Sequence, residues 1–251
     1  MIDVHTHILP HIDDGAKDLT TAKALLQEEQ AQGVSCVVFT PHYYGRKYSP
    51  QSFLEKREEA FSQIKDFLPQ GLQVKLGAEV HFSGVNVPEY DKLCSLAIEG
   101  TKYILLELPF TEKWRDNLLN KVSDFVCETG YTPIIAHVER YSEVRKTPSI
   151  VNELIEMGCL IQINASSFWD KKDKGFAFAL LKHGLVHCIG SDAHDTDLRV
   201  PCLAEAKQTF EKAGFAESWE EIQSNMREIL SDEKVEAISY APVKNFFGLY
   251  R

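Results

Sequence analysis

Side chains that bind metal ions are concentrated near the start of the sequence. The segment VHTHILPHIDDG, residues 4–15, contains three histidines and two aspartates. Imidazole nitrogens and carboxylate oxygens are suited to divalent ions such as Mn, Fe, Zn or Co. The same residue types are also common in polar surface loops and in disordered segments. Other histidines and carboxylates in the chain distinguish these interpretations.

Further metal-binding residues follow short apolar segments that read as strands. Six of the seven segments end at, or run into, a histidine or an acidic residue. These residues are His5 and His7, His42, Glu79 and His81, Glu107, His137 and Glu139, and Asp192 and His194. The carboxyl ends of parallel strands lie together, and α/β enzymes place their active sites there. A carboxylate inside an apolar strand is costly unless it is paired or metal-bound, so Glu79 and Glu107 favour a metal site most strongly.

The elements that must position these residues alternate along the chain. Strands are expected at 2–5, 34–40, 72–80, 102–108, 132–138, 159–165 and 186–192. Segments with helical periodicity are expected at 19–32, 53–68, 113–129, 201–213 and 218–231, with two more that end at Gly158 and Gly184. This alternation predicts right-handed crossovers, a parallel sheet and a single α/β domain. A closed or nearly closed barrel and an open doubly wound sheet both fit the pattern.

Composition and missing motifs exclude several classes of protein. The chain has 251 residues and a formal charge of -10, which disfavours nucleic acid as a partner. The apolar segments are too short to span a membrane, and the start does not read as a signal peptide, so we expect a cytoplasmic protein without membrane insertion. The six cysteines form no C-x-x-C pair and read as reduced core residues. None has an arginine six positions later, which disfavours a cysteine-nucleophile phosphatase. Nucleotide-binding glycine motifs are also missing.

Four motifs together resemble the polymerase and histidinol phosphatase (PHP) superfamily. They are DVHTHILPHIDDG, TPHY, AHVERY and GSDAH, with Glu79 in GAEV and Glu107 in LLELP between them. The chain is most similar to the bacterial capsule-operon metal-dependent tyrosine phosphatases of the CpsB/YwqE type. The resemblance covers nearly the whole chain. It implies a distorted (β/α)7 barrel that forms one domain over residues 1–251.

The resemblance also implies a site with three divalent ions. Manganese is the metal it favours, with Fe, Zn, Co or Mg as alternatives. By motif, the first ion is held by His5, His7, Glu79 and Asp192, the second by Glu79, Glu107 and His137, and the third by His42, His194 and Asp14. Asp14 is chosen over Asp13, and His11 is left out as a rim residue. Arg140 and Arg199 correspond to arginines that bind the substrate phosphate, a task that suits the guanidinium group.

The implied activity is hydrolysis of phosphotyrosine on a protein. The expected substrate is the tyrosine-rich tail of a bacterial tyrosine kinase that controls capsule or exopolysaccharide synthesis. The segment 41–50, PHYYGRKYSP, reads either as a rim that contacts this substrate or as a solvated loop. One alternative is a small-molecule phosphatase of the same superfamily, such as a histidinol-phosphatase. Another is a binding protein that has lost catalysis, which the complete ligand set and both arginines disfavour.

Overall fold

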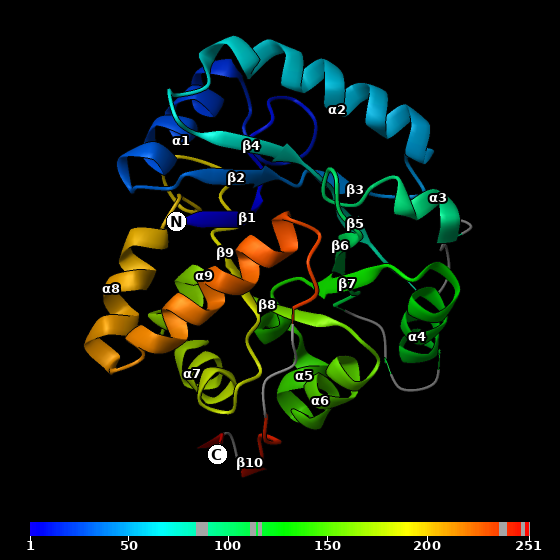
Figure 1. The fold of residues 1–251 in the computed structure, drawn as a ribbon, viewed down its shortest axis with the longest axis vertical. Helices are drawn as coiled ribbons and strands as arrows, with labels where there is room; N and C mark the ends of the chain where they lie inside the picture. Colours follow the sequence, from blue (N-terminus) through cyan, green and yellow to red (C-terminus); the bar gives the residue numbers. More distant parts are fainter. Residues whose placement is uncertain (84–89, 111–113, 115–116, 236–239, 247–248, 251) are drawn as a thin grey trace.

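The computed structural model describes residues 1–83, 90–110, 114, 117–235, 240–246 and 249–250. Its centre is a curled sheet of parallel strands with helices around the outside (Figure 1). The strands are β1 (Ile2–Thr6), β2 (Cys36–Phe39), β3 (His42–Tyr43), β4 (Gln73–Leu76), β5 (Glu79–His81), β6 (Tyr103–Glu107), β7 (Thr132–Ile135), β8 (Leu160–Asn164), β9 (Cys188–Gly190), β10 (Asn245–Phe246) and β11 (Leu249–Tyr250).

The α-helices follow the strands along the chain. They are α1 (Leu19–Ala31), α2 (Pro50–Ile64), α3 (Tyr90–Cys94), α4 (Leu118–Thr129), α5 (Ser142–Lys146), α6 (Ser149–Glu156), α7 (Lys174–Lys182), α8 (Leu203–Ala213) and α9 (Ala216–Leu230). Short 3-10 helices lie at Lys65–Phe67, Val138–Arg140 and Ala165–Phe168. Within the described residues, no helix has the length and apolar character needed to cross a bilayer.

The sheet is parallel apart from a small ribbon at the end of the chain. One part has the order β1-β2-β4, and the other has the order β3-β5-β6-β7-β8-β9. Thr6 forms a parallel bridge with Ala193, just beyond β9, so β1 lies beside β9. The β10 and β11 strands pair in antiparallel fashion. The parallel strands therefore curl into a half-barrel, which confirms the α/β class.

Every expected strand segment contains a strand, but the segment at 72–80 contains two. It divides into β4 and β5 at Gly77–Ala78, and the chain between β2 and β3 is interrupted in the same way at Thr40–Pro41. Pro41 has no amide proton to donate to a sheet. At the break, the Glu79 amide instead donates to the Thr40 and Pro41 carbonyls. The two breaks turn β3 and β5 away from β2 and β4, and β3 is a strand that periodicity did not predict.

Most helices also form near the expected positions. Helix α1 begins after Asp18, whose carboxylate caps the helix by accepting from the Thr21 amide. Helix α2 starts at Pro50 instead of 53, because Ser49 caps it and proline suits a first turn. Helix α4 is shorter than the segment 113–129, part of which lies outside the described residues. The five-residue helices α3 and α5 are too short for periodicity to reveal.

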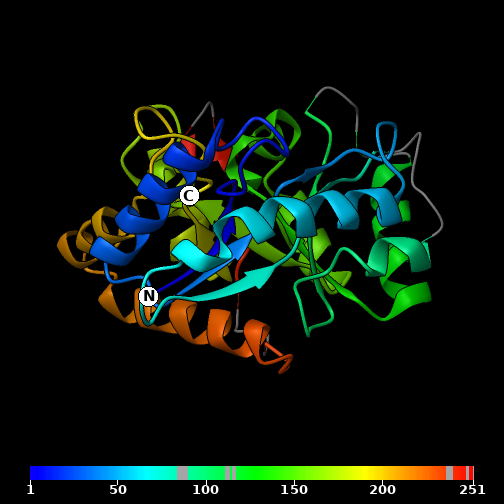
Figure 2. The ribbon, with the colours of Figure 1, turned by 90° about the horizontal axis from the view of Figure 1, so that it is seen from above.

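Helix α9 covers the amino ends of the strands and leaves their carboxyl ends for the site. The Gln223 side chain accepts from the Ile2 amide, and the Asn225 side chain donates to the His187 carbonyl. Trp219 and Met226 are buried in the same helix. Figure 2 shows α9 along the edge of the molecule opposite the loop that follows β1. The body thus has one closed end and one end formed by loops.

Close packing of β9 against β1 requires a glycine at position 190. A Cβ atom there would lie 2.4 Å from the Cβ atom of His5. We expect Gly190→Ala to lower the free energy of unfolding by about 1–3 kcal/mol, as overpacked cores do. Gly175→Ala is the matched control, because a Cβ atom at Gly175 meets nothing within 4 Å. Urea denaturation measures both variants, and equal stability would contradict the contact between the two strands.

Buried His187 makes the fold sensitive to acid. Its Nδ1 accepts from the Ile161 amide, and burial lowers its pKa to about 4. The unfolded chain therefore binds a proton first, and the free energy of unfolding falls as the pH drops from about 6.5 to about 4. We expect His187→Gln, which keeps an acceptor but not the titration, to remove up to about 3 kcal/mol of this loss. Urea denaturation of wild type and variant at pH 7 and pH 4.5 measures the loss of unfolding free energy in each. The same pH dependence in both proteins would argue against a neutral buried His187.

Candidate metal centre

The loops at the carboxyl ends of the strands bring the predicted metal ligands together. Eight of the nine lie in three overlapping groups whose candidate ligand atoms are all within 4.8 Å of one another in each group. The groups are His5, His7 and Asp192; His42, Glu79 and Glu107; and His7, Asp14, His42 and His194. The ninth residue, His137, directly contacts Glu79. The spacing of ligands along six strands therefore does produce one cluster.

The first group lies on the first and last strands of the barrel-like sheet. His5 and His7 alternate along and just after β1, so they share a face, and their Nε2 atoms are 3.1 Å apart. Asp192 Oδ1 lies 3.5 Å from His5 Nε2 and 3.4 Å from His7 Nε2. Glu79 Oε2 is at a similar distance, 3.4 and 3.3 Å from the same two nitrogens. These four residues are the ones that the family resemblance assigns to the first ion.

The second group surrounds the carboxylates of β5 and β6. His137 Nε2 lies 2.8 Å from Glu79 Oε1 and 3.7 Å from Glu107 Oε1. On the far side, His42 Nδ1 is 2.8 Å from Glu79 Oε2. His81, which was not among the predicted ligands, places its Nδ1 3.1 Å from Glu107 Oε2. Glu79 thus belongs to the second group and also contacts the two histidines of the first group, as a bridging carboxylate would.

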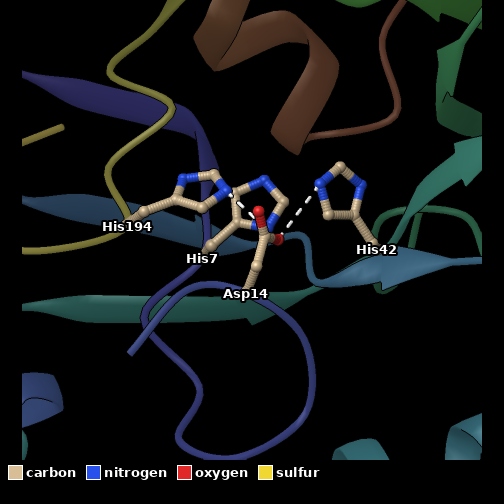
Figure 3. A group of neighbouring side chains, drawn as sticks. All are labelled: His7, Asp14, His42 and His194. Carbon is tan, nitrogen blue, oxygen red and sulfur yellow. Dashed lines mark ion pairs between the residues drawn. The ribbon is translucent and has the colours of Figure 1, made fainter. Parts of the chain in front are cut away.

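The third group is formed by residues from three segments: the loop after β1, strand β3 and the loop after β9 (Figure 3). Asp14 Oδ1 lies 3.5 Å from His42 Nε2 and 3.6 Å from His194 Nε2. The ring of His7 packs between the rings of His42 and His194, with its centroid 3.9 Å from that of His194. Because the Asp14 side chain is 65% exposed, this group is the part of the cluster closest to solvent.

Asp13 has a different place from Asp14. Its Oδ2 accepts from His7 Nδ1 at 2.7 Å and from the His42 amide at 2.9 Å. Its Oδ1 accepts from the amide of Gly15, where a Cβ atom would lie 2.1 Å from the His7 carbonyl oxygen. The glycine of the DDG sequence therefore lets the loop fold back onto His7. As a result, Asp13 orients a histidine from behind, and Asp14 is the aspartate that faces the cluster.

Hydrogen bonds behind the cluster fix which nitrogen each histidine presents. His5 donates from Nδ1 to Gln162 Oε1, and His194 donates from Nδ1 to the Asp192 carbonyl. With the bond from His7 to Asp13, all three rings keep Nε2 directed at the cluster. Such contacts to the second nitrogen are typical of metal-binding histidines. Gln162 is a functional residue that the sequence pattern did not reveal.

The segment 159–165, which forms β8, was the one expected strand segment without a predicted ligand, and it supplies positioning groups instead. Gln162 Oε1 also accepts from the His137 amide at 2.7 Å. Two positions later, Asn164 donates from its side-chain amide to Asp192 Oδ2 at 2.8 Å. The polar pair QxN on one face of an apolar strand was the available signal. Both residues lie on the face that lines the cluster.

Two residues of the cluster have backbone conformations that side chains other than glycine rarely adopt. His137 has φ 34° and Asp192 has φ 56°. The His137 conformation is held by a hydrogen bond that its backbone amide donates to the Gln162 side chain. That of Asp192 is held by a hydrogen bond that its backbone amide donates to the His5 carbonyl. Strain of this kind costs about 1–3 kcal/mol and is concentrated at functional sites. Here it turns both side chains toward the neighbouring ligands just after their strands end.

Electrostatics show that the cluster is built to hold positive charge. Burial alone would raise the pKa of the Glu79 carboxyl, but His5 and His42 outweigh it and hold the pKa well below its usual range. Burial likewise would lower the pKa of His7, but Asp13 and Glu79 raise it to about 10. Without metal, protonated histidines therefore supply the charge that balances the carboxylates.

Several buried polar atoms in the cluster have no hydrogen-bond partner. His137 Nδ1 and His194 Nε2 are two of them. His42 Nδ1 and Glu79 Oε2 also make no hydrogen bond, although they lie 2.8 Å apart as an ion pair. Unsatisfied atoms in a buried site are costly, and a divalent ion would satisfy them. The donor set contains nitrogen and oxygen but no sulfur, which suits Mn, Fe, Zn or Co. The residues present therefore fit the metal ions that the spacing predicted.

Both predicted phosphate-binding arginines reach the cluster. Arg140 Nη1 lies 3.3 Å from Asp192 Oδ2, and Arg199 Nη2 lies 2.8 Å from Asp192 Oδ1. Arg199 also approaches Asp14, at 3.9 Å. The loop before Arg199 is tied by Asp195, whose Oδ1 accepts from three following amides. Both arginine side chains are more than one-third exposed, so an incoming anion can reach them.

Of the four histidines that were left out of the ligand set, His81 contacts Glu107, and the other three lie elsewhere. His11 is exposed and lies in none of the three groups, in agreement with its assignment to the rim. His183 contacts the Ala241 carbonyl, and His187 is buried below the sheet contacts of β8. Both make contacts that belong to the fold and not to the cluster.

Comparisons with known proteins point to one family. A family model described as "Capsular polysaccharide synthesis, CpsB/CapC" matches residues 1–231. The tyrosine-protein phosphatase CpsB of Streptococcus agalactiae serotype III (strain NEM316) is 33% identical over 216 residues, covering 82% of this chain and 88% of that protein. The tyrosine-protein phosphatase YwqE of Bacillus subtilis (strain 168) is 31% identical over 260 aligned positions, covering 100% of each chain.

A solved structure agrees with the sequence comparisons. It is described as "Crystal structures of YwqE from Bacillus subtilis and CpsB from Streptococcus pneumoniae, unique metal-dependent tyrosine phosphatases". The match has a TM-score of 0.82 and 28% sequence identity, and it covers 98% of this chain and 100% of the other. The fold and the sequence over most of the chain thus agree, and the chain belongs to the CpsB/CapC family of capsular polysaccharide synthesis proteins.

Proposed function

We propose that this protein is a metal-dependent protein-tyrosine phosphatase that acts in capsule or exopolysaccharide synthesis. The observation that carries this proposal is the buried cluster of histidines and carboxylates, with two arginines directed onto it, in a member of the CpsB/CapC family. Relatives that match over most of the chain are named tyrosine-protein phosphatases. These names favour phosphotyrosine over histidinol phosphate as the substrate.

The cluster is proposed to hold three divalent ions, with manganese preferred over Fe, Zn, Co or Mg. His5, His7, Glu79 and Asp192 are assigned to the first ion, Glu79, Glu107 and His137 to the second, and His42, His194 and Asp14 to the third. The contacts of His42 support its place, because Nε2 faces Asp14 while Nδ1 faces Glu79. Divalent ions held there would activate water and neutralise phosphate oxygens.

The side chains around the cluster bind and orient the substrate. Arg140 and Arg199 approach from two different loops, and each can donate two hydrogen bonds to phosphate oxygens. As they take up the phosphate, they exchange contacts with Asp192 for contacts with the substrate. Because both guanidinium groups carry fixed positive charge, they also stabilise the charge that develops during transfer to water. The tyrosine side chain of the substrate leaves toward the open loop end of the molecule.

A covalent route through cysteine has no support in the structure. None of the three metal-binding groups contains a cysteine. Burial raises the pKa of Cys159 to about 12 and also raises the pKa of Cys188 and Cys202, which disfavours the nucleophilic thiolate. Cys127 is exposed, but it lies on α4, outside the cluster. These positions favour the water-based reaction over a cysteine nucleophile.

The fold is proposed to be a distorted (β/α)7 barrel in one domain that spans residues 1–251. Support comes from the strand pairing, if β2 with β3 and β4 with β5 are each taken as one broken strand. The order then runs from β1 through these two to β6, β7, β8 and β9, and returns to β1 through Thr6 and Ala193. A single buried core extends from β1 to α9.

The partner is proposed to be the tyrosine-rich tail of a bacterial tyrosine kinase. The family's link to capsular polysaccharide synthesis supports this assignment. We also propose a cytoplasmic location, because all six cysteines are free thiols, as is usual in reducing compartments.

Metal removal and thiol alkylation are expected to have opposite effects on activity. We expect a chelator to abolish hydrolysis of a phosphotyrosine peptide, and manganese to restore it, because the phosphate site depends on bound cations. Iodoacetamide on the metal-loaded enzyme should modify exposed Cys127 and leave the rate unchanged. Mass spectrometry confirms the modification in the same sample. A rate that falls in proportion to alkylation would contradict the proposal.

Substitutions should separate metal binding from phosphate binding. We expect His5→Ala to lower the metal content, measured by inductively coupled plasma mass spectrometry, whereas the control His183→Ala keeps it. Arg140→Ala should keep its metal ions but lower kcat/KM for a phosphotyrosine peptide by on the order of 10²-fold, as loss of one preorganised donor typically does. Full metal content in His5→Ala, or metal loss in Arg140→Ala, would refute the roles assigned.

A further inference from the structure

Large apolar side chains are exposed mainly around the metal centre. Within the described residues, those exposed are Tyr44, Phe67, Phe110 and Leu198. Three of the four lie in loops of the site: Tyr44 follows β3, Phe110 follows β6, and Leu198 precedes Arg199. An exposed apolar group beside a polar pocket is a common mark of a binding surface. The two aromatic rings at the site are therefore candidates for contact with the substrate.

Tyr44 lies beside His42, which belongs to the second and third groups, and beside His81, which contacts Glu107. Its ring centroid is 5.4 Å from that of His42 and 5.5 Å from that of His81. The residue is 39% exposed, so part of the ring remains open to solvent after these contacts. Because His42 faces both Glu79 and Asp14, the Tyr44 ring stands directly beside the cluster.

Phe110 lies beside His137, the predicted ligand that contacts Glu79 from outside the three groups. Its ring is stacked on that of His137, at 5.7 Å between centroids and 22° between planes. The guanidinium carbon of Arg140 lies 5.2 Å from the ring centre. Phe110 is also 39% exposed. The ring therefore adjoins both a proposed metal ligand and a proposed phosphate-binding arginine.

The Phe110 ring is held in place from below. It packs 5.0 Å from the ring of Tyr141, whose hydroxyl accepts from the Leu108 amide. Tyr141 in turn meets Trp114 edge-on, and the Trp114 indole donates to the Pro109 carbonyl. Tyr141 and Trp114 are both buried. A ring supported in this way is preorganised, so little conformational entropy is lost when a ligand packs on it.

The two rings contact different histidines, and these histidines contact the two different oxygens of Glu79. Tyr44 contacts His42, and Phe110 contacts His137, which contacts Glu79. A phosphate bound between the arginines and the cluster directs its ester oxygen and organic group outward, past this rim. A phenyl group fills the space beside one or both rings, whereas a short alkyl group offers no aromatic face.

We propose that Tyr44 and Phe110 are specificity-determining residues that contact the ring of phosphotyrosine and make the site prefer aryl over alkyl phosphates. This inference rests on the proposed phosphatase function. It assigns the aromatic preference to two side chains outside the set that binds metal or phosphate. The rings contribute to the binding of the organic group of the ester. Their removal therefore lowers the affinity for aryl ligands and leaves the affinity for alkyl ligands unchanged.

Competitive inhibition by two phosphonates tests the proposal. Metal-loaded wild type, Tyr44→Leu and Phe110→Leu are assayed with p-nitrophenyl phosphate in the presence of benzylphosphonate or propylphosphonate. We expect each leucine variant to raise the inhibition constant of benzylphosphonate by roughly 3- to 10-fold, the range for one aromatic pair. The inhibition constant of propylphosphonate should change by less than about 2-fold. Metal content should be unchanged. Tyr44→Phe and Phe110→Tyr should behave like wild type, because each retains a ring.

Phe67→Leu is the matched control, because Phe67 is exposed but packs against Lys23, away from the site. It should leave both inhibition constants unchanged. Equal weakening of both phosphonates by Tyr44→Leu and Phe110→Leu would show that the rings only support the phosphate site, and would overturn the proposal. Unchanged inhibition by benzylphosphonate would overturn it too. Failure of the metal-loaded wild type to hydrolyse any phosphotyrosine peptide would instead refute the proposed function.

Discussion

The structure depends on one buried carboxylate that four histidines share. Glu79 has no exposed surface, and its two oxygens lie between 2.8 and 3.4 Å from nitrogens of His5, His7, His42 and His137. An isolated charge in such a place would be very unfavourable, so its neighbours must supply positive charge as protons or as metal ions. Those four histidines lie on or just after β1, on β3 and in the loop after β7. Their convergence fixes how the strands meet.

The breaks in the sheet follow from this constraint. The interruption at Thr40–Pro41 separates β3 from β2, and the one at Gly77–Ala78 separates β5 from β4. As a result, His42 pairs in register with Glu79, and His81 with Glu107. Asp192 plays the complementary part on the other side of the cluster, where Asn164, Arg140 and Arg199 share its two oxygens. The sheet curls so that these two carboxylates lie together.

The sequence was enough to predict most of the strands, most helices and most of the residues that gather in the cluster. This was possible because a charged residue at the end of an apolar strand is costly to bury unless a partner or a metal ion compensates it. The predictions failed where the determining contact is distant in sequence. Examples are the split of 72–80 into β4 and β5, and the hydrogen bonds of Gln162 to His5 and His137.

The exposed rings of Tyr44 and Phe110 also depend on contacts between residues that are distant in sequence. Nothing in the local sequence places Phe110 on His137 or supports it through Tyr141 and Trp114, since those contacts join the segment after β6 to the segment after β7. The left-handed backbone at His137 and Asp192 is likewise set by bonds from other strands. Ligand types can be predicted from single positions, but orientation and substrate preference arise from tertiary packing.

The central claim is that the shared carboxylate Glu79 organises a cluster of three metal ions. Anomalous X-ray diffraction from crystals grown with manganese tests it most directly. We expect three anomalous peaks, two of them within bonding distance of Glu79 and the third beside Asp14, His42 and His194. A cluster without peaks, or manganese bound only outside these residues, would contradict it.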